Sequence, residues 1–176
     1  MDSIRAKFFW QGANDKSKYY MMRWDAVTRP KKFGGLGIIN TRIMNDCLLT
    51  KWIYKICRDC QDTWCKLLKA EYMPDNDFFS SKVRGTSQFW QGLHKVKHLF
   101  QWGAIYKGRN GKRTRFWQEW NHLTQNVTLQ DTKDEIEWGL GKSRMFTTRS
   151  LYRFLTFRGI NNNIISKVWS AKILLK

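Results

Sequence analysis

The sequence predicts a mainly helical α+β fold, and three features of the 176-residue chain support that class. Apolar residues recur with helical spacing in three long stretches between residues 41 and 100. Near residue 110 the pattern changes to alternation around an Asn-Gly pair, which is typical of a β-hairpin. Hydrophobic residues make up 42% and aromatic residues 15% of the chain, too much apolar area for a disordered basic tail. We expect a three-helix core, one or two small β-hairpins and C-terminal helices.

The N-terminal segment, residues 1–38, is expected to end in a glycine-rich loop. Its first part, Ile4 to Trp10, mixes apolar and basic residues and is too short to stand alone. Tyr19 to Val27 predicts a short helix, which must stop before Pro30 because the residue preceding a proline is pushed out of the α region. The run Gly34-Gly35-Leu36-Gly37 then predicts a loop.

Three helices are predicted within residues 39–102. Asn40 or Thr41 provides an N-cap for the first and Ser87 for the third, because a side-chain oxygen there accepts a hydrogen bond from a free backbone N–H. The helices run over Thr41 to Arg58, Thr63 to Tyr72 and Ser87 to Phe100. The apolar stripes that should pack together are Met44, Leu48, Trp52 and Ile56, widened by Ile43, Cys47 and Ile53; Trp64, Leu67, Leu68 and Tyr72; and Phe89, Trp90, Leu93, Val96, Leu99 and Phe100.

The last segment, residues 103–176, should contain the β-structure. Asn110-Gly111 is the strongest two-residue signal for a type I′ hairpin turn. The stretch from Ile105 to Arg109 leads into this turn, and Lys112 to Trp117 supplies a return strand. Strand alternation should turn Phe116 inward, so that the hairpin lies against the three helices.

Weaker signals follow the hairpin. Glu135 to Leu140 and Arg144 to Thr147 flank a Gly-Lys-Ser turn and predict a second hairpin. Helices are expected at Ser150 to Phe157 and at Ile164 to Lys172. The final residues, Ile173-Leu174-Leu175-Lys176, are apolar without a predicted partner, which indicates an incomplete domain.

The predicted basic hairpin is also the candidate nucleic-acid surface. Cations neutralise phosphates, and neighbouring aromatic residues such as Trp117 and Trp120 can stack on unpaired bases. Strand alternation would equally leave the same cations as a solvated face. A net charge of +18 favours an RNA or DNA partner that is bound with little sequence preference. The candidate residues are Lys107, Arg109, Lys112, Arg113 and Arg115, with a second, weaker run at Arg29, Lys31 and Lys32.

A membrane partner is not expected. No apolar run approaches the roughly 18 residues of a membrane-spanning helix, and no predicted helix pairs a lysine-rich face with a clean apolar face. The N-terminus lacks the apolar core of a secretory signal, and the four cysteines form no dense framework, which favours reduced thiols. We expect an intracellular protein of the nucleus or cytoplasm.

No catalytic or cofactor site is predicted. Two-metal nucleotidyl transfer needs closely placed carboxylates, and the sequence contains no Asp-Asp pair. The acidic cluster Asp131, Asp134, Glu135 and Glu137 has no nearby histidine and is interpreted as a solvated loop or helix start. We predict that the isolated chain is not an enzyme and needs no cofactor.

One set of residues has metal-like internal spacing. Cys57 and Cys60, followed by His94 and His98, suit tetrahedral zinc when each pair is taken alone. A whole predicted helix separates the two pairs, whereas compact fingers place them roughly 12 to 15 residues apart. We therefore predict no metal site.

Short motifs follow one another along the whole chain in a recognisable order. The first half contains Phe8 to Gly12, Trp24-Asp25, Arg29 to Ile38, and Asn45 with Leu48 to Trp52. The second half contains Ser87 to Trp90, Gly108 to Gly111, Arg115 to Trp120, Phe146 to Tyr152 and Val168 to Ile173. This order resembles the region after the polymerase thumb in plant LINE-type non-LTR retrotransposon reverse transcriptases.

The resemblance implies a connector between a polymerase and a zinc-binding module. The family's palm, with its paired aspartates, would precede residue 1, and its reverse-transcriptase zinc-binding segment would follow residue 176. No position of this chain matches those carboxylates or ligands, and Leu174 stands where the family usually has proline. The resemblance therefore implies a non-catalytic fragment of a polyprotein whose parent is an RNA-directed DNA polymerase.

Two other functions stay open at this point. The chain could be a free-standing, domesticated RNA- or DNA-binding protein, which a stable and cooperatively unfolding monomer would favour. An active reverse transcriptase or nuclease is disfavoured because the metal-binding carboxylates are missing, and primer extension with and without Mg²⁺ tests it.

Overall fold

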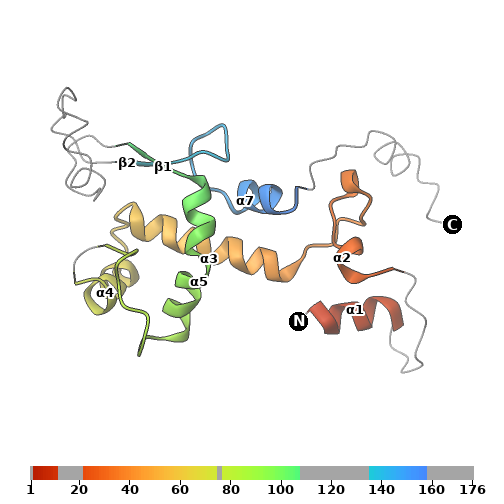
Figure 1. Ribbon diagram of the computed structural model, residues 1–176, viewed down its shortest axis with the longest axis horizontal. Coiled ribbons are helices and arrows are strands. Elements are labelled where there is room, and N and C mark those ends of the chain that lie inside the picture. Colours follow the sequence, from red (N-terminus) through yellow and green to blue (C-terminus); the bar gives the residue numbers. More distant parts are fainter. Residues whose placement is uncertain (1, 12–21, 75–76, 108–134, 158–176) are drawn as a thin grey trace. The chain divides into compact units, whose positions relative to one another are not determined.

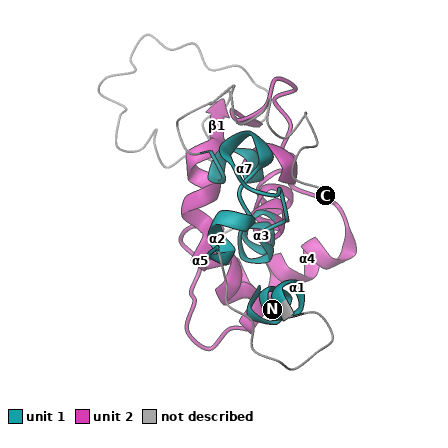
Figure 2. Ribbon diagram, turned by 90° about the vertical axis from the view of Figure 1, so that its right-hand side faces the viewer, with its two compact units in different colours: residues 1–47, 152–176 teal, residues 48–151 magenta. Residues whose placement is uncertain are grey.

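The structure is a computed structural model that describes residues 2–11, 22–74, 77–107 and 135–157 (Figure 1). As predicted, these residues form a mainly helical α+β fold with one two-stranded sheet. The chain divides into two compact units, residues 1–47 with 152–176 and residues 48–151 (Figure 2). The unit boundaries fall within α3 (Thr41–Cys57) and α7 (Thr148–Leu155). In the described part of the chain, none of the helices combines the length and hydropathy that a membrane crossing needs.

The first unit begins with α1 (Asp2–Gln11), which includes the stretch from Ile4 to Trp10. Other parts of this unit hold the helix, as expected for a stretch too short to stand alone. Arg5 Nη1 donates a hydrogen bond to the carbonyl oxygen of Ile39 at 2.7 Å. The carboxylate of Asp2 accepts one from Thr41 Oγ1, which lowers the pKa of Asp2 below its usual range.

The second helix of this unit is shorter than the prediction from Tyr19 to Val27. Helix α2 spans Trp24–Val27, and Arg23 before it is extended. Residues 19–21 lie outside the described residues. The helix ends where predicted, because Thr28 and Arg29 lead to Pro30, which is followed by the short 3-10 helix η1 (Lys31–Phe33).

The glycine-rich loop after η1 is confirmed, and the structure supplies its physical reason. Gly34 and Gly37 have φ angles of 83° and 74°, a left-handed region that favours glycine. At Gly35, an added Cβ would lie 2.1 Å from the carbonyl oxygen of Arg29, so that a larger residue cannot fit without moving the backbone. The Gly37 N–H donates to the same carbonyl at 2.9 Å, which closes the loop.

The predicted caps of the first and third helices are present. Asn40 Oδ1 accepts a hydrogen bond from the N–H of Ile43 at 3.1 Å at the start of α3. Ser87 Oγ accepts one from the N–H of Trp90 at 3.3 Å at the start of α5 (Gln88–Gly103). Helix α4 (Thr63–Tyr72) has the predicted bounds. In Figure 1, α4, α5 and the second half of α3 form the helical group of the second unit.

Helix α5 supplies much of the second unit's core. Trp90, Leu93 and Phe100 are fully buried. The ring of Phe78 meets Trp90 edge-on at 5.3 Å between centroids, and Tyr72 stacks on it at 4.8 Å. This aromatic packing fixes α5 relative to α4 and to the chain between them.

Three residues assigned to the core by the sequence are exposed instead. Leu48 is 46%, Leu67 65% and Phe89 37% exposed. On α3, residues four apart drift around a helix of about 3.6 residues per turn, so a stripe counted in fours leaves the buried face. The buried face of α3 contains Cys47, Ile53 and Ile56 from the predicted stripe, together with Thr50, a polar residue that interrupts the apolar pattern. On α4 the buried position is Cys65, and Leu67 points away from it.

The sheet pairs strands that the sequence assigned to two different hairpins. Strand β1 (Ala104–Lys107) runs antiparallel to β2 (Glu135–Trp138), with Ala104 opposite Trp138 and Lys107 opposite Glu135. The Asn110-Gly111 turn and its return strand lie outside the described residues. The second predicted hairpin is present only as a turn, because Trp138 N–H donates to the carbonyl of Arg144 at 2.8 Å without a strand over residues 144–147. Trp138, at the end of β2, is fully buried.

Helix α7 corresponds to the helix predicted at Ser150 to Phe157, shifted toward the N-terminus. Thr147 Oγ1 accepts a hydrogen bond from the N–H of Ser150 at 3.1 Å, a capping contact that accounts for the earlier start. The helix predicted at Ile164 to Lys172 and the apolar end of the chain lie outside the described residues. The same is true of Phe116, Asp131 and Asp134.

Candidate nucleic-acid interface

Lys107 is the one candidate cation of the predicted basic hairpin that lies among the described residues. It ends β1, and its Nζ lies 2.5 Å from Glu137 Oε1 on β2. Arg144 Nε approaches the other oxygen of Glu137 at 4.0 Å. Lys107 is therefore paired with a carboxylate, which reduces the charge it presents to a polyanion. Arg109, Lys112, Arg113 and Arg115 lie outside the described residues.

The interpretation of the acidic cluster as a solvated loop or helix start is wrong for Glu137. It lies in strand β2, and its side chain is only 21% exposed between Lys107 and Arg144. The sequence did not reveal this because strand pairing brings Lys107 and Glu137 together from positions 30 residues apart.

The second predicted run divides into one structural residue and two exposed ones. Arg29 forms an ion pair with Asp25 at 3.7 Å, and its backbone carbonyl closes the glycine loop. Its guanidinium is thus engaged within the fold. Lys31 and Lys32 are exposed on η1, and within the described ranges neither has a carboxylate partner. Lys32 Nζ lies 4.6 Å from the centre of the Phe33 ring, a cation–π distance that leaves the ammonium open to phosphate.

The exposed face of α5 is a polar surface with one cation and no acidic residue, and the sequence analysis missed it. Gln91, Lys95, His98 and Trp102 follow one another at spacings of four, three and four residues, so they lie on one side of the helix. We call these four residues the α5 outer face. The indole of Trp102 is 59% exposed and meets the His98 ring edge-on at 5.4 Å. The sequence of α5 contains no acidic residue.

A signal for this face was present in the sequence. The buried positions of α5 are spaced so regularly that the intervening polar positions must share the opposite side. An aromatic residue on the polar side of an amphipathic helix was the specific indication.

The residues with zinc-like spacing have different surroundings. His94 is buried, its ring stacks on Phe78 at 4.6 Å, and its Nε2 lies 3.1 Å from Ser81 Oγ. Burial lowers the pKa of His94, and the nearby charge of Lys97 lowers it further. His98 is exposed on the α5 outer face. Across the part of the chain that the structure describes, no group of three or more His, Cys, Asp or Glu side chains is arranged to hold a metal ion.

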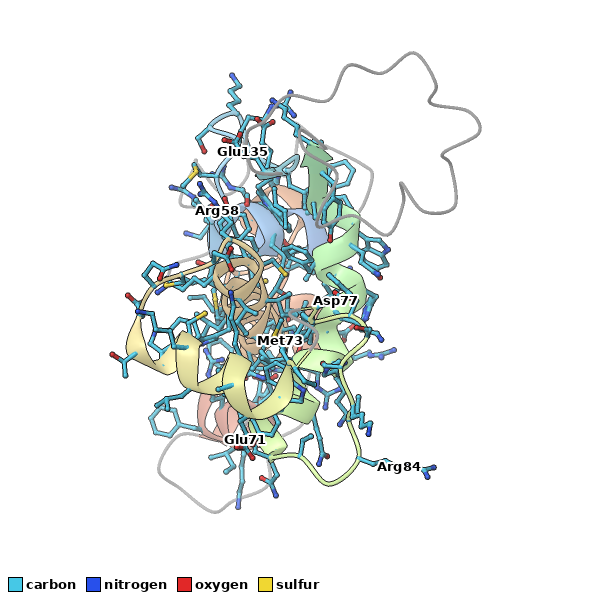
Figure 3. The ribbon with its side chains drawn as sticks, turned by 90° about the vertical axis from the view of Figure 1, so that its left-hand side faces the viewer. Arg58, Glu71, Met73, Asp77, Arg84 and Glu135 are labelled. Carbon is cyan, nitrogen blue, oxygen red and sulfur yellow. The ribbon has the colours of Figure 1, made fainter. Side chains whose placement is uncertain are left out.

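A cleft of about 360 Å³ lies beside the chain between α4 and α5. Its lining combines the carboxylates of Glu71 and Asp77 with the cations of Lys82 and Arg84. Figure 3 shows Arg84 pointing away from the ribbon. Because both signs of charge line this cleft, it is less suited to a polyanion than the α5 outer face.

Comparisons with known proteins give one partial likeness. The chain is 24% identical over 123 residues to a protein of Arabidopsis thaliana named "Putative ribonuclease H protein At1g65750". The match covers 68% of this chain and 20% of that protein, so this chain spans about a fifth of the length of the curated relative. The sequence matches no family model. It also matches no solved structure.

Proposed function

We propose that this chain is a non-catalytic segment of a retrotransposon reverse transcriptase polyprotein that holds RNA or DNA by its charge. The order of motifs supports this, because it resembles the region after the polymerase thumb in plant LINE-type elements. The partial likeness to a plant protein named as a ribonuclease H is consistent with such an origin. The net charge of +18 supplies the attraction for phosphate.

The observation that carries the binding proposal is the set of exposed cations without carboxylate partners among the described residues. This set includes Lys31 and Lys32 in the first unit and Lys95, on the α5 outer face, in the second unit. Cations already paired within the fold, such as Lys107 and Arg29, contribute less because a phosphate must compete with an existing carboxylate.

The salt dependence of binding tests this proposal. Affinity for a fluorescein-labelled oligo(U) single strand should fall linearly on a plot of log affinity against log salt. The double variant Lys31→Ala/Lys32→Ala should flatten that slope by about 1.4, at roughly 0.7 per phosphate contact on a single strand. Lys107→Ala is the matched control and should change the slope less. Affinity that does not depend on salt would contradict electrostatic binding.

The hairpin cations are part of the same proposal. Arg109, Lys112, Arg113 and Arg115 should add phosphate contacts of the same largely sequence-independent kind. Replacing three of them with alanine should flatten the salt slope by about 2. An unchanged slope in a folded triple variant would show that these residues form a solvated face.

We also propose that the isolated chain has no catalytic activity of its own. The absence of an Asp-Asp pair from the sequence supports this. Primer extension on an RNA template and cleavage of an RNA–DNA hybrid, each with and without Mg²⁺, test the two activities. Activity that requires Mg²⁺ in purified protein would overturn the proposal.

A free-standing nucleic-acid-binding protein is the alternative function. The buried aromatic core around Trp90 and Trp138 favours it, because such a core could support folding of the second unit without a polymerase. A monomer that unfolds in one cooperative transition and binds oligo(U) would favour this alternative over a polyprotein segment. A chain that aggregates or unfolds gradually would favour the segment.

A further inference from the structure

We propose that Met145 is an oxidation site whose sulfoxide is bound by Arg58 and Tyr54, so that oxidation by hydrogen peroxide stabilises the second unit. This inference does not depend on the proposed function. Met145 lies in the turn between β2 and α7, and its side chain is 49% exposed. Tyr54 belongs to the last turns of α3, and Arg58 directly follows that helix. All three residues are part of the second unit.

Two hydrogen-bond donors converge on the Met145 sulfur. Arg58 Nη1 lies 3.2 Å from Met145 Sδ and 3.2 Å from Tyr54 Oη. The Tyr54 hydroxyl donates to the same sulfur at 3.7 Å. The hydroxyl therefore accepts a hydrogen bond from Arg58 and directs its own proton at Met145. Because Tyr54 is buried, this proton depends on a protein acceptor more than an exposed one would.

The acceptor in this cluster is weaker than its donors. A thioether sulfur accepts hydrogen bonds weakly, whereas a guanidinium is a charged donor that forms strong ones. Oxidation converts the thioether into a polar sulfoxide, whose oxygen carries much of the negative charge of the S–O bond. Arg58 and Tyr54 already lie where they can donate to such an oxygen. The surroundings of Met145 thus suit the oxidised side chain better than the reduced one.

The reaction is a two-electron oxidation of sulfur. A lone pair of the Met145 sulfur attacks one oxygen of hydrogen peroxide, so that an S–O bond forms while the O–O bond breaks. The departing hydroxide takes the proton left on the transferred oxygen and becomes water. Sulfur loses two electrons and the peroxide gains them. A methionine sulfoxide reductase restores the thioether, so the change is reversible.

Two other methionines provide references within the same chain. Met73 is 4% exposed, so peroxide cannot easily reach it. Met22, in the first unit, is 47% exposed and thus as accessible as Met145, but no hydrogen bond to its sulfur occurs among the described residues. A sulfoxide usually disturbs packing because it places a polar group among apolar ones. Oxidation should therefore add a contact at Met145 and none at Met22.

The test treats the full chain with hydrogen peroxide and then with dithiothreitol, which reverses disulfide formation but leaves sulfoxides. Peptide mass mapping should find one added oxygen on Met145 and on Met22, and none on Met73. Met145→Leu is the reference variant because leucine has a similar volume and is not oxidised. The change in thermal midpoint on oxidation should be about 2–4 °C more positive in wild type than in Met145→Leu, the size expected for one added hydrogen bond.

Variants of the two donors test the binding of the sulfoxide. Arg58→Ala should abolish the difference between Met145 and leucine at this position, whereas Lys51→Ala, an exposed cation on α3, should keep it. Tyr54→Phe keeps the ring, removes the hydroxyl and should reduce the difference. If Arg58→Ala does not fold, Tyr54→Phe gives the same test.

Three outcomes would overturn the inference. Met145 could stay reduced in folded protein while Met22 is oxidised. Oxidation could shift the midpoint of wild type no more favourably than that of Met145→Leu. The difference could also persist undiminished in folded Arg58→Ala and Tyr54→Phe, which would show that these donors do not bind the sulfoxide.

Discussion

The two faces of α5 have the same helical backbone and opposite surroundings. On the inner face, Trp90 and Phe100 have no exposed surface and pack among other aromatic rings. On the outer face, Lys95 and Trp102 are exposed. Contacts on the inner side fix the helix, so residues on the outer side can be changed without unfolding it. The comparison teaches that stability and binding in this helix depend on different residues.

The largest expected effect is on the inner face. Trp90→Ala should lower the free energy of unfolding by about 3–5 kcal/mol, because it leaves a cavity between Tyr72, Phe78 and His94. Chemical denaturation measures this change. Trp90→Phe is the matched variant and should cost much less, because it keeps a ring and removes an indole Nε1 that has no hydrogen-bond partner among the described residues. Equal losses for both variants would contradict the cavity explanation.

The next largest loss of stability is expected at the C-terminal end of the inner face of α5, where the helix leads into β1. At Gly103 an added Cβ would lie 2.4 Å from the buried ring of Trp138, whose Nε1 donates to Ser150 Oγ at 2.8 Å. Gly103→Ala should therefore destabilise the chain by about 1–3 kcal/mol through overpacking. Denaturant titration measures the change in the unfolding free energy.

Gly92→Ala is the control for Gly103→Ala within the same helix. Its added Cβ would meet Leu49 Cδ1 at 3.7 Å, an ordinary contact. Alanine is a better helix former than glycine, so this variant should be stabilised by up to about 1 kcal/mol. Stabilisation of similar size in both variants would show that helix propensity, and not the Trp138 ring, decides the outcome.

The start of α5 gives a smaller effect. Ser87→Ala removes the oxygen that accepts the N–H of Trp90, and should cost about 1 kcal/mol of unfolding free energy. Ser87→Asp keeps an acceptor at the same position and should retain most of the stability. Thermal unfolding of the two variants, compared with wild type, measures the cap separately from the core.

For the helices α3 to α5, the sequence predicted where each helix begins and ends better than which side chains are buried. The bounds of α4 and the caps at Asn40 and Ser87 followed from local signals, because caps and turn residues act over a few positions. The pairing of β1 with β2 did not follow from local signals. It depends on buried Trp138, which lies far along the chain from Gly103. Non-local packing of this kind leaves little mark on the sequence near either strand.

The candidate site was predicted in part for the same reason. Lys31 and Lys32 were found from composition and are exposed, as a binding role requires. Composition could not show that Lys107 is paired with Glu137, because that pair forms only across the sheet. Trp102 was missed because the helical pattern was examined for its apolar residues, although the same pattern defines an outer face.

The buried histidine of α5 makes the inner face sensitive to pH. Burial lowers the pKa of His94, with Lys97 as a second cause, so the unfolded chain takes up a proton more readily than the folded one. The unfolding free energy should therefore fall as pH drops below the unfolded imidazole pKa of about 6.5, and be fully retained above it. Denaturation at several pH values should show a smaller decline in His94→Gln than in wild type.

The smallest effect on stability is expected at Lys95. This residue gives the most direct test of the difference between the inner and outer faces of α5. Lys95 is exposed and has no carboxylate partner among the described residues, so Lys95→Ala should change the unfolding free energy by less than about 0.5 kcal/mol. The same variant should flatten the salt slope for oligo(U) by roughly 0.7, because one phosphate contact is lost. A change in binding without a change in stability separates the two faces. A Lys95→Ala variant that loses stability but keeps the wild-type slope would show that the outer face also supports the fold.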